Sequence, residues 1–202
     1  MKGLVWGVGI NDADYKVKIQ DSWYENGKQK FKLVWVCPFY SKWKSMLERV
    51  YSQKFKEKYP SYRECSVCEE WVTFSNFKAW MQQQDWEGKH LDKDILYPGN
   101  KLYSPDTCVF VDPKVNIFLV DRQRGRGKYM IGVCWHVLEN KFQAQCQGLS
   151  KKNKFLGYFD TELEAHKAWL ACKLELAKQL AAEQTDPRVA KALIERYENY
   201  EA

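Results

Sequence analysis

Long apolar runs are missing from this 202-residue sequence. No stretch approaches the roughly 18 consecutive apolar residues that a transmembrane helix needs, so we expect no membrane-spanning segment. The start of the chain also lacks the hydrophobic region of a secretory signal, because Leu4-Val5-Trp6 soon gives way to polar residues. These absences predict a protein of the cytoplasm that is not bound to a membrane.

Paired cysteine motifs are also scarce. The seven cysteines are an odd number spread along the whole chain, which indicates a reducing cytosol and not a disulfide framework. Cys65 and Cys68 have the spacing of zinc ligands, but a structural site needs two more ligands and the sequence has no second pair. Cys37 and Cys108 could complete such a site from a distance. We expect buried free thiols and no structural zinc.

Apolar and basic residues are plentiful. Hydrophobic residues make up 45% of the chain, and nine Trp and twelve Tyr supply enough large apolar area for a core. The net charge is +6, and it is concentrated between Arg122 and Phe155, where eight basic residues face Glu139 alone. A localised basic patch is typical of a protein with a polyanionic partner, although a solvated lysine-rich surface is the plainer alternative.

The first half of the chain reads as a hairpin followed by helices. Alternating residues in Tyr15–Ile19 and Phe31–Trp35 predict two strands, joined by a longer loop around Asn26-Gly27. A helix should follow Pro38, with Ser41 as a possible cap, and a second should begin near Thr73 or Ser75. The predicted apolar faces of these two helices consist of Tyr40, Trp43, Leu47 and Val50, and of Phe74, Phe77, Trp80 and Met81.

The basic, Gly-interrupted segment 122–128 is the only convincing linker. Three strand candidates follow it, at 129–135, 141–146 and 155–159. Thr161-Glu162-Leu163-Glu164 has the pattern of a capping box and should open a helix that runs to about Ala182, and Asp186-Pro187 should cap another. Three strands covered on one face by a helix leave the other face free to enter a DNA groove.

Four motifs in this C-terminal part resemble the AP2 domain. They are Gly132-Val133-Cys134-Trp135, Lys141-Phe142-Gln143-Ala144, Leu156-Gly157-Tyr158-Phe159 and Glu164-Ala165-His166-Lys167-Ala168-Trp169. The resemblance implies that strand residues bind DNA, some at phosphates and some at base edges. With the basic residues of the linker and loops, the candidates are Arg122, Arg124, Arg126, Lys128, Trp135, His136, Lys141, Gln143, Gln145, Lys151, Lys152 and Lys154.

The central segment carries residues suited to metal chemistry. Asp92 and Asp94 are two apart on an expected strand, so their carboxylates should project from the same face. A loop with Asn100, a second strand and a short helix that Pro113 opens and that holds Asn116 follow. Acidic and amide oxygens that converge in a strand–loop–strand–helix layout suit Mg²⁺ or Mn²⁺.

This segment resembles the HNH endonucleases, especially a phage group related to free-standing homing endonucleases. Stretches that carry the resemblance are Cys37-Pro38-x-Tyr40-x-x-Trp43, Gly99-Asn100-Lys101 and Tyr103-Ser104-Pro105-x-Thr107-Cys108. The resemblance implies that Asp92 and Asn116 are metal ligands, with Asp94 as a possible further one, and that Asn100 orients the loop. Lys93 stands where that family usually has the histidine that acts as general base. Lys93, Asp94, His90 or a hydroxide on the metal are the alternatives for this role.

The sequence as a whole therefore predicts an α+β protein: a ββα-metal, HNH-like module joined to an AP2-like three-stranded sheet with one packing helix. The expected divisions are an N-terminal hairpin segment at 1–36, a nuclease module at 37–121, the linker at 122–128 and the DNA-binding domain at 129–202. We expect a monomeric, metal-dependent endonuclease for double-stranded DNA in the cytoplasm of a phage-infected bacterium, without an organic cofactor. The alternatives are a non-catalytic phage DNA-binding regulator on a degenerate HNH scaffold and a protein that blocks a host factor.

Overall fold

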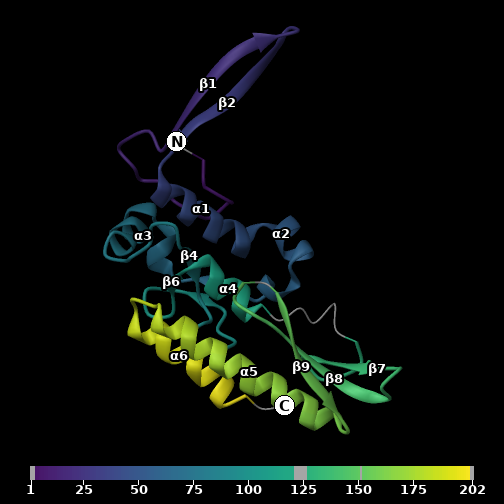
Figure 1. Ribbon diagram of the computed structural model, residues 1–202. Coiled ribbons are helices and arrows are strands. Elements are labelled where there is room, and N and C mark those ends of the chain that lie inside the picture. The colour runs from purple at the N-terminus through teal and green to yellow at the C-terminus, as the bar shows by residue number, and fades with distance from the viewer. Residues whose placement is uncertain (1–2, 121–126, 151, 201–202) are drawn as a thin grey trace. The chain divides into compact units, whose positions relative to one another are not determined.

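The computed structural model describes residues 3–120, 127–150 and 152–200 of the chain (Figure 1). It is mixed α+β with several small sheets, as the sequence predicts. The chain divides into two compact units, Met1–Phe110 and Val111–Ala202. This division falls before the predicted linker at 122–128, of which residues 122–126 lie outside the described part. Within the described part, no helix is both long enough and apolar enough to cross a membrane.

The first unit begins with a β-hairpin of strands β1 (Lys18–Glu25) and β2 (Lys28–Val36), drawn in purple in Figure 1. The turn has only two residues, and both Asn26 and Gly27 have positive φ angles, 50° and 72°, as a type I′ turn requires. The prediction of a longer loop was therefore wrong, because Asn-Gly is the pair that best tolerates this backbone. All residues of both strands except Val36 are exposed.

Helix α1 (Pro38–Tyr51) has the predicted apolar face, and Tyr40, Trp43, Leu47 and Val50 are all buried. Pro38 occupies the first turn, where its missing N–H is not needed, and Cys37 takes the cap position. The suggestion that Ser41 caps this helix was wrong, since Ser41 already lies inside the first turns. A short helix α2 (Gln53–Lys58) follows and is capped by Ser52, whose hydroxyl accepts from Phe55 N.

Helix α3 (Phe74–Met81) packs on α1 and supplies the other half of an aromatic core. Two 3₁₀ turns, η1 (Pro60–Tyr62) and η2 (Glu69–Val72), lie between α2 and α3, and the second carries buried Trp71. The Trp43 indole donates to the Trp71 carbonyl oxygen at 2.7 Å, so a buried polar group is satisfied inside the core. The predicted helix is confirmed: Phe74 and Phe77 are buried in the core, and partly buried Trp80 packs against it.

Four short strands complete the centre of the chain. Strand β3 (Ser66–Val67) pairs in parallel with β5 (Leu102–Tyr103), and β4 (His90–Asp92) pairs with β6 (Val109–Val111). The predicted strand, loop and strand are present, but the first strand is shorter than predicted, because β4 ends at Asp92. The segment that carries the candidate metal ligands therefore leaves the sheet immediately after that residue.

The second unit contains α4 (Pro113–Leu119), a three-stranded antiparallel sheet and two long helices. The sheet order is β7 (Val133–His136), β8 (Lys141–Gln147) and β9 (Asn153–Phe159). Helix α5 (Glu162–Ala182) contacts all three strands and packs along α6 (Pro187–Glu198), as Figure 1 shows in green and yellow. Three strands with one packing helix were predicted, and this arrangement is confirmed.

Local sequence explains how α5 is fixed to its sheet. The capping box at its start is present, with the Thr161 hydroxyl accepting from Glu164 N and the Glu164 carboxylate accepting from Thr161 N. Gly132 has a φ of +83°, and a β-carbon at that position would lie 2.1 Å from Cδ1 of Trp169. The glycine therefore allows buried Trp169 to pack directly on the backbone that leads into β7.

Candidate functional site

Asp92 is the last residue of β4, and its side chain shapes the turn that follows. Its Oδ1 accepts hydrogen bonds from the backbone N–H groups of Asp94 at 2.9 Å and Ile95 at 2.8 Å. Such an Asx turn ends the strand at Asp92. The prediction that Asp92 and Asp94 project from one face of a strand was therefore wrong, because Asp94 lies in the bend beyond it.

The two carboxyl groups nevertheless lie close together. Burial raises the pKa of Asp92, and the nearby charge of Asp94 raises it further, with the two side chains within hydrogen-bonding distance of each other. The two backbone hydrogen bonds at Oδ1 oppose this shift without cancelling it. Asp92 is thus a partly desolvated carboxyl group next to a like charge, which is an arrangement that a cation would stabilise.

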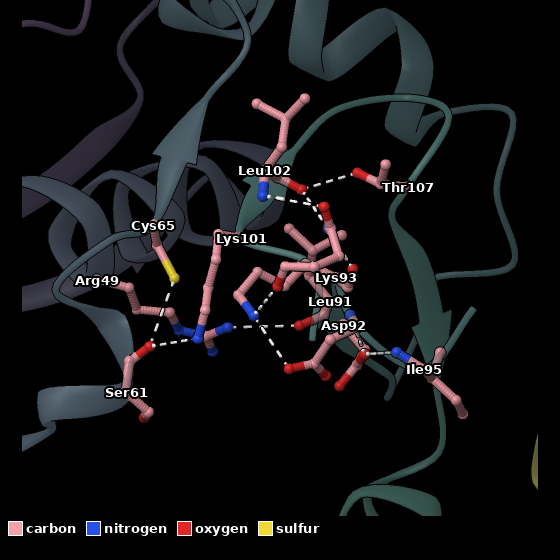
Figure 2. Close-up of polar contacts among 12 residues, drawn as sticks. Arg49, Ser61, Cys65, Leu91, Asp92, Lys93, Ile95, Lys101, Leu102 and Thr107 are labelled. Carbon is pink, nitrogen blue, oxygen red and sulfur yellow. Dashed lines mark hydrogen bonds and ion pairs between the residues drawn. The ribbon is translucent and has the colours of Figure 1, made fainter. Parts of the chain in front are cut away.

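Lys93 points into the protein and is only 6% exposed (Figure 2). Its Nζ donates to the carbonyl oxygen of Asn100 at 2.8 Å and to Oδ2 of Asp94 at 3.0 Å. The Lys93 nitrogen also lies over the Tyr62 ring, 5.9 Å from its centroid. Both polar contacts use the ammonium group as a donor, so Lys93 holds the loop together and also neutralises part of the charge of Asp94.

Asn100 fixes the other end of the same loop. Its Nδ2 donates to the carbonyl oxygens of Lys93 at 2.6 Å and Leu102 at 2.7 Å, and its Oδ1 accepts from Leu102 N at 3.2 Å. Thr107 adds a further bond from its hydroxyl to the Leu102 carbonyl oxygen at 2.8 Å. Asn100 thereby ties the residue after β4 to the first residue of β5, and the orienting role that the resemblance implies for it stays a prediction.

His90 and Asp92 are two apart on β4, so they lie on one side of the strand while buried Leu91 lies on the other. Burial lowers the pKa of His90, and the positive charges of Lys42 and Arg49 lower it further. Arg49 is tied to this strand because its Nη1 donates to the Leu91 carbonyl oxygen at 3.4 Å (Figure 2). The His90 imidazole is exposed, so it is accessible to a substrate.

Asn116 is partly buried on α4 and therefore belongs to the second unit, whereas Asp92 and Asp94 belong to the first. The role of Asn116 as a metal ligand stays a prediction. Within the described ranges, no three His, Cys, Asp or Glu side chains are grouped as a metal site of protein ligands alone would require. Asp92 and Asp94 are two neighbouring carboxyl groups, and their role as metal ligands also stays a prediction.

All seven cysteines have free thiols. Of the four zinc candidates, Cys37 lies 3.8 Å from the Tyr15 hydroxyl, and Cys65 donates to the Ser61 carbonyl oxygen at 3.8 Å. Burial raises the pKa of Cys108 to about 12 and also raises that of Cys65. Cys68 is half-buried, and burial raises its pKa as well. Burial therefore favours the neutral form of the Cys65, Cys68 and Cys108 thiols, and the absence of a structural zinc stays a prediction.

The sheet of the second unit has one covered and one open face. Ala144 and Cys146 on β8 are buried on the side of α5, so Gln143 and Gln145 lie on the opposite side. Cross-strand pairing places Cys134 and Tyr158 beside Gln143 on that open face. The Tyr158 ring lies 5.0 Å from the rings of both His136 and Phe155, which gives a row of aromatic side chains next to amide groups.

The predicted DNA-binding residues divide between these faces. His136, Lys141, Gln143 and Gln145 share the open face, and Lys141 forms an ion pair with Asp160 at 2.9 Å. Trp135 pairs with Phe142 and Lys154 with Cys146, which places both on the helix side. Lys128 and Lys152 are exposed outside the strands. Arg122, Arg124, Arg126 and Lys151 lie outside the described residues.

Sequence reasoning missed several residues that the structure brings to these sites. Lys42 and Arg49 are off the apolar stripe of α1, and their seven-residue spacing could have indicated a shared second face. Tyr158 and Phe155 were not among the candidates, although the register of β9 places both on the open face. A register shift between Ala144 and Gln145 hides this pattern, because it breaks the simple alternation along the paired strands.

Comparison of the chain with protein-family models, with curated proteins and with solved structures finds no match in any of the three.

Proposed function

We propose that this protein is a DNA-binding endonuclease that hydrolyses phosphodiester bonds with a divalent metal ion. In this proposal the loop from β4 to β5 is an HNH-like catalytic centre, and the β7–β9 sheet is an AP2-like DNA-binding surface. The observation that carries the proposal is the Asp92 turn, in which a partly desolvated carboxyl group lies next to the like charge of Asp94. A bound Mg²⁺ or Mn²⁺ would relieve that repulsion.

The donor chemistry of the turn fits such an ion. One oxygen of Asp92 is engaged by the two backbone N–H groups, which orients the carboxylate and leaves the other oxygen for a metal. Asp94 is a candidate second ligand, although its Oδ2 also accepts from Lys93. When bound, the metal would stabilise the charge that develops on the phosphate and on the leaving oxygen.

His90 is the residue that we propose as general base. It shares a strand face with Asp92, its ring is exposed, and a lowered pKa keeps the imidazole neutral and able to accept a proton at neutral pH. Lys93 is a weaker candidate for the general base than His90. Its nitrogen already donates to Asn100 and Asp94 inside the protein, away from a substrate.

The open sheet face supports the DNA-binding half of the proposal. Gln143 and Gln145 lie on the open face, and such amide groups read base edges when they enter the major groove. The basic residues around the sheet, including Lys128 and Lys152, would contact phosphates. Binding that depends on such contacts should weaken steeply with salt, by about 0.9 log units per log unit of salt for each neutralised phosphate.

The test is incubation of the purified full-length chain with phage and host DNA in Mg²⁺, in Mn²⁺ and in EDTA. The proposal expects nicks or cuts with either metal and none with EDTA. Salt-dependent DNA binding without cleavage under any of these conditions would instead favour the non-catalytic DNA-binding regulator. The ion pair between Lys93 and Asp94 supports the regulator as a second candidate function, because it partly neutralises the carboxylate pair that a metal would need.

A further inference from the structure

A small polar hollow lies between α1 and β4, next to the Asp92 turn but separate from it. Its walls are formed by Lys42, Ser45, Met46, Arg49, His90 and Leu91. The volume is about 80 Å³, room for several water molecules or for one tetrahedral oxyanion. No acidic side chain is among these lining residues, so the hollow is surrounded by positive and neutral groups.

The fold fixes the two cationic side chains of the hollow, Lys42 and Arg49. Lys42 and Arg49 are seven residues apart on α1, which puts them on one face two turns apart. Lys42 Nζ donates to the Lys89 carbonyl oxygen, and Arg49 Nη1 donates to the Leu91 carbonyl oxygen at 3.4 Å. Lys42 is oriented by its bond to the segment that enters β4. Arg49 also has a hydrogen bond with the Tyr103 side chain and is attracted by Asp92, and both side chains keep further N–H donors for a ligand.

Lys42 and Arg49 repel each other, and the carboxylate of Asp92, which is not among the lining residues, offsets part of the charge of Arg49. Burial lowers the pKa of Lys42, and the positive charge of Arg49 lowers it further. The Phe110 ring, whose centroid lies 6.0 Å from Lys42 Nζ, offers only weak compensation. An anion between the two side chains would convert this repulsion into two charge-assisted contacts.

We propose that this hollow is an oxyanion site and that its natural occupant is a backbone phosphate of DNA, held by Lys42, Arg49 and the rim hydroxyl of Ser45. The choice of DNA as the source of the phosphate rests on the proposed function, whereas oxyanion binding itself does not. A phosphate held here would lie beside the strand that ends at Asp92, so the site would position the DNA backbone for the catalytic turn.

The test uses the full-length chain and two lysines of the same helix. Lys42→Gln removes a cation from the hollow, and Lys44→Gln is the matched control, because Lys44 points elsewhere, toward the Trp6 ring. The first measurement is the thermal midpoint in sodium phosphate against sodium chloride at equal ionic strength. Phosphate should raise the midpoint of the wild type and of Lys44→Gln, with the affinity of Lys42→Gln about tenfold weaker.

The second measurement is the salt dependence of duplex DNA binding. Lys42→Gln should lower the log–log slope by about one relative to the wild type and Lys44→Gln. Ser45→Glu, at the exposed rim, is the second variant in case Lys42→Gln does not fold, and it should abolish phosphate binding by adding a negative charge.

Each outcome decides a separate point. In one outcome, phosphate raises the thermal midpoint of the wild type while the variants keep the wild-type salt slope of DNA binding. This result would uphold the oxyanion site but assign it to free phosphate. No phosphate response in the wild type and an unchanged DNA slope would overturn the inference, even if the protein cleaves DNA. Positive results in both measurements without any cleavage would uphold the site while the proposed endonuclease activity fails.

Discussion

Lys93 and Asn100 exchange hydrogen bonds across the loop between β4 and β5. Lys93 Nζ donates to the Asn100 carbonyl oxygen at 2.8 Å, and Asn100 Nδ2 donates to the Lys93 carbonyl oxygen at 2.6 Å. The two residues thus close the loop reciprocally. Lys93 therefore serves the structure of the loop through this pair.

Lys93→Met should therefore reduce stability strongly. The variant keeps an apolar stem of similar length but leaves the Asn100 carbonyl oxygen and Asp94 without their buried partner, which should lower the free energy of unfolding by about 2–4 kcal/mol. Lys101→Met is the control, because its nitrogen makes one longer bond to the Ser61 carbonyl oxygen at 3.3 Å. Urea unfolding measures both variants. A loss below about 1 kcal/mol for Lys93→Met would contradict the structural role.

Asp92→Asn should increase stability at neutral pH in the presence of EDTA. The amide oxygen can still accept from Asp94 N and Ile95 N, but the buried charge is gone. Because burial and Asp94 raise the folded-state pKa of Asp92 above its unfolded value, the fold binds the proton more tightly than the unfolded chain does. The wild type should therefore lose stability as pH rises through that folded pKa.

The comparison with Asp92→Asn isolates this effect. The stability advantage of the variant should be near zero below about pH 4 and should grow as the pH rises toward 7. Urea unfolding across this range is the measurement. A variant that is less stable than the wild type by the same amount at every pH would show that the carboxylate carries no such penalty.

Gln143→Ala and Tyr158→Ala should weaken DNA binding, and Gln143→Ala should also relax sequence preference by about 1–3 kcal/mol at one base pair. Both side chains lie on the open face of the β7–β9 sheet. Lys178→Gln is the control, because this exposed residue is on α5, which packs on the other face. Gel-shift titration against a panel of duplexes tests the assignment. Equal effects of Lys178→Gln and Gln143→Ala would argue against the open face as the DNA surface.

Gly132→Ala should destabilise the second unit by about 2 kcal/mol or more. The new methyl group would meet the Trp169 ring at 2.1 Å, and the φ of +83° is unfavourable for alanine. Gly127→Ala is the control, because nothing lies within 4 Å of the added carbon at that position. Thermal unfolding of the two variants should differ by several degrees. Similar midpoints would mean that Trp169 does not pack on this backbone.

The parts of the fold that the sequence predicted well are those with local signals. Helices α1, α3, α5 and α6 follow from apolar periodicity, prolines at first turns and the Thr161–Glu164 capping box, all of which act within a few residues. The parallel pairing of β3 with β5 joins segments about 36 residues apart and has only two residues per strand. Such short, nonlocal pairs leave no periodic pattern in the sequence.

The candidate site was predictable in its residues but not in its geometry. Asp92, Lys93, Asp94 and Asn100 do lie together in one loop. A strand was expected to continue through Asp94, but the Asp92 side chain competes with strand hydrogen bonding and ends it. The inward direction of Lys93 depends on partners that this turn creates, and sequence spacing alone does not reveal it.

The most direct test of the central claim is nicking of supercoiled plasmid by the wild type and by Asp92→Asn, with the DNA affinity of each measured in parallel. We predict that the wild type nicks in Mg²⁺ or Mn²⁺ and stops in EDTA. The variant should bind DNA with similar affinity while its nicking rate falls by about two orders of magnitude or more, since a charged ligand is lost. Undiminished nicking by Asp92→Asn, or no metal-dependent nicking by the wild type, would contradict the account.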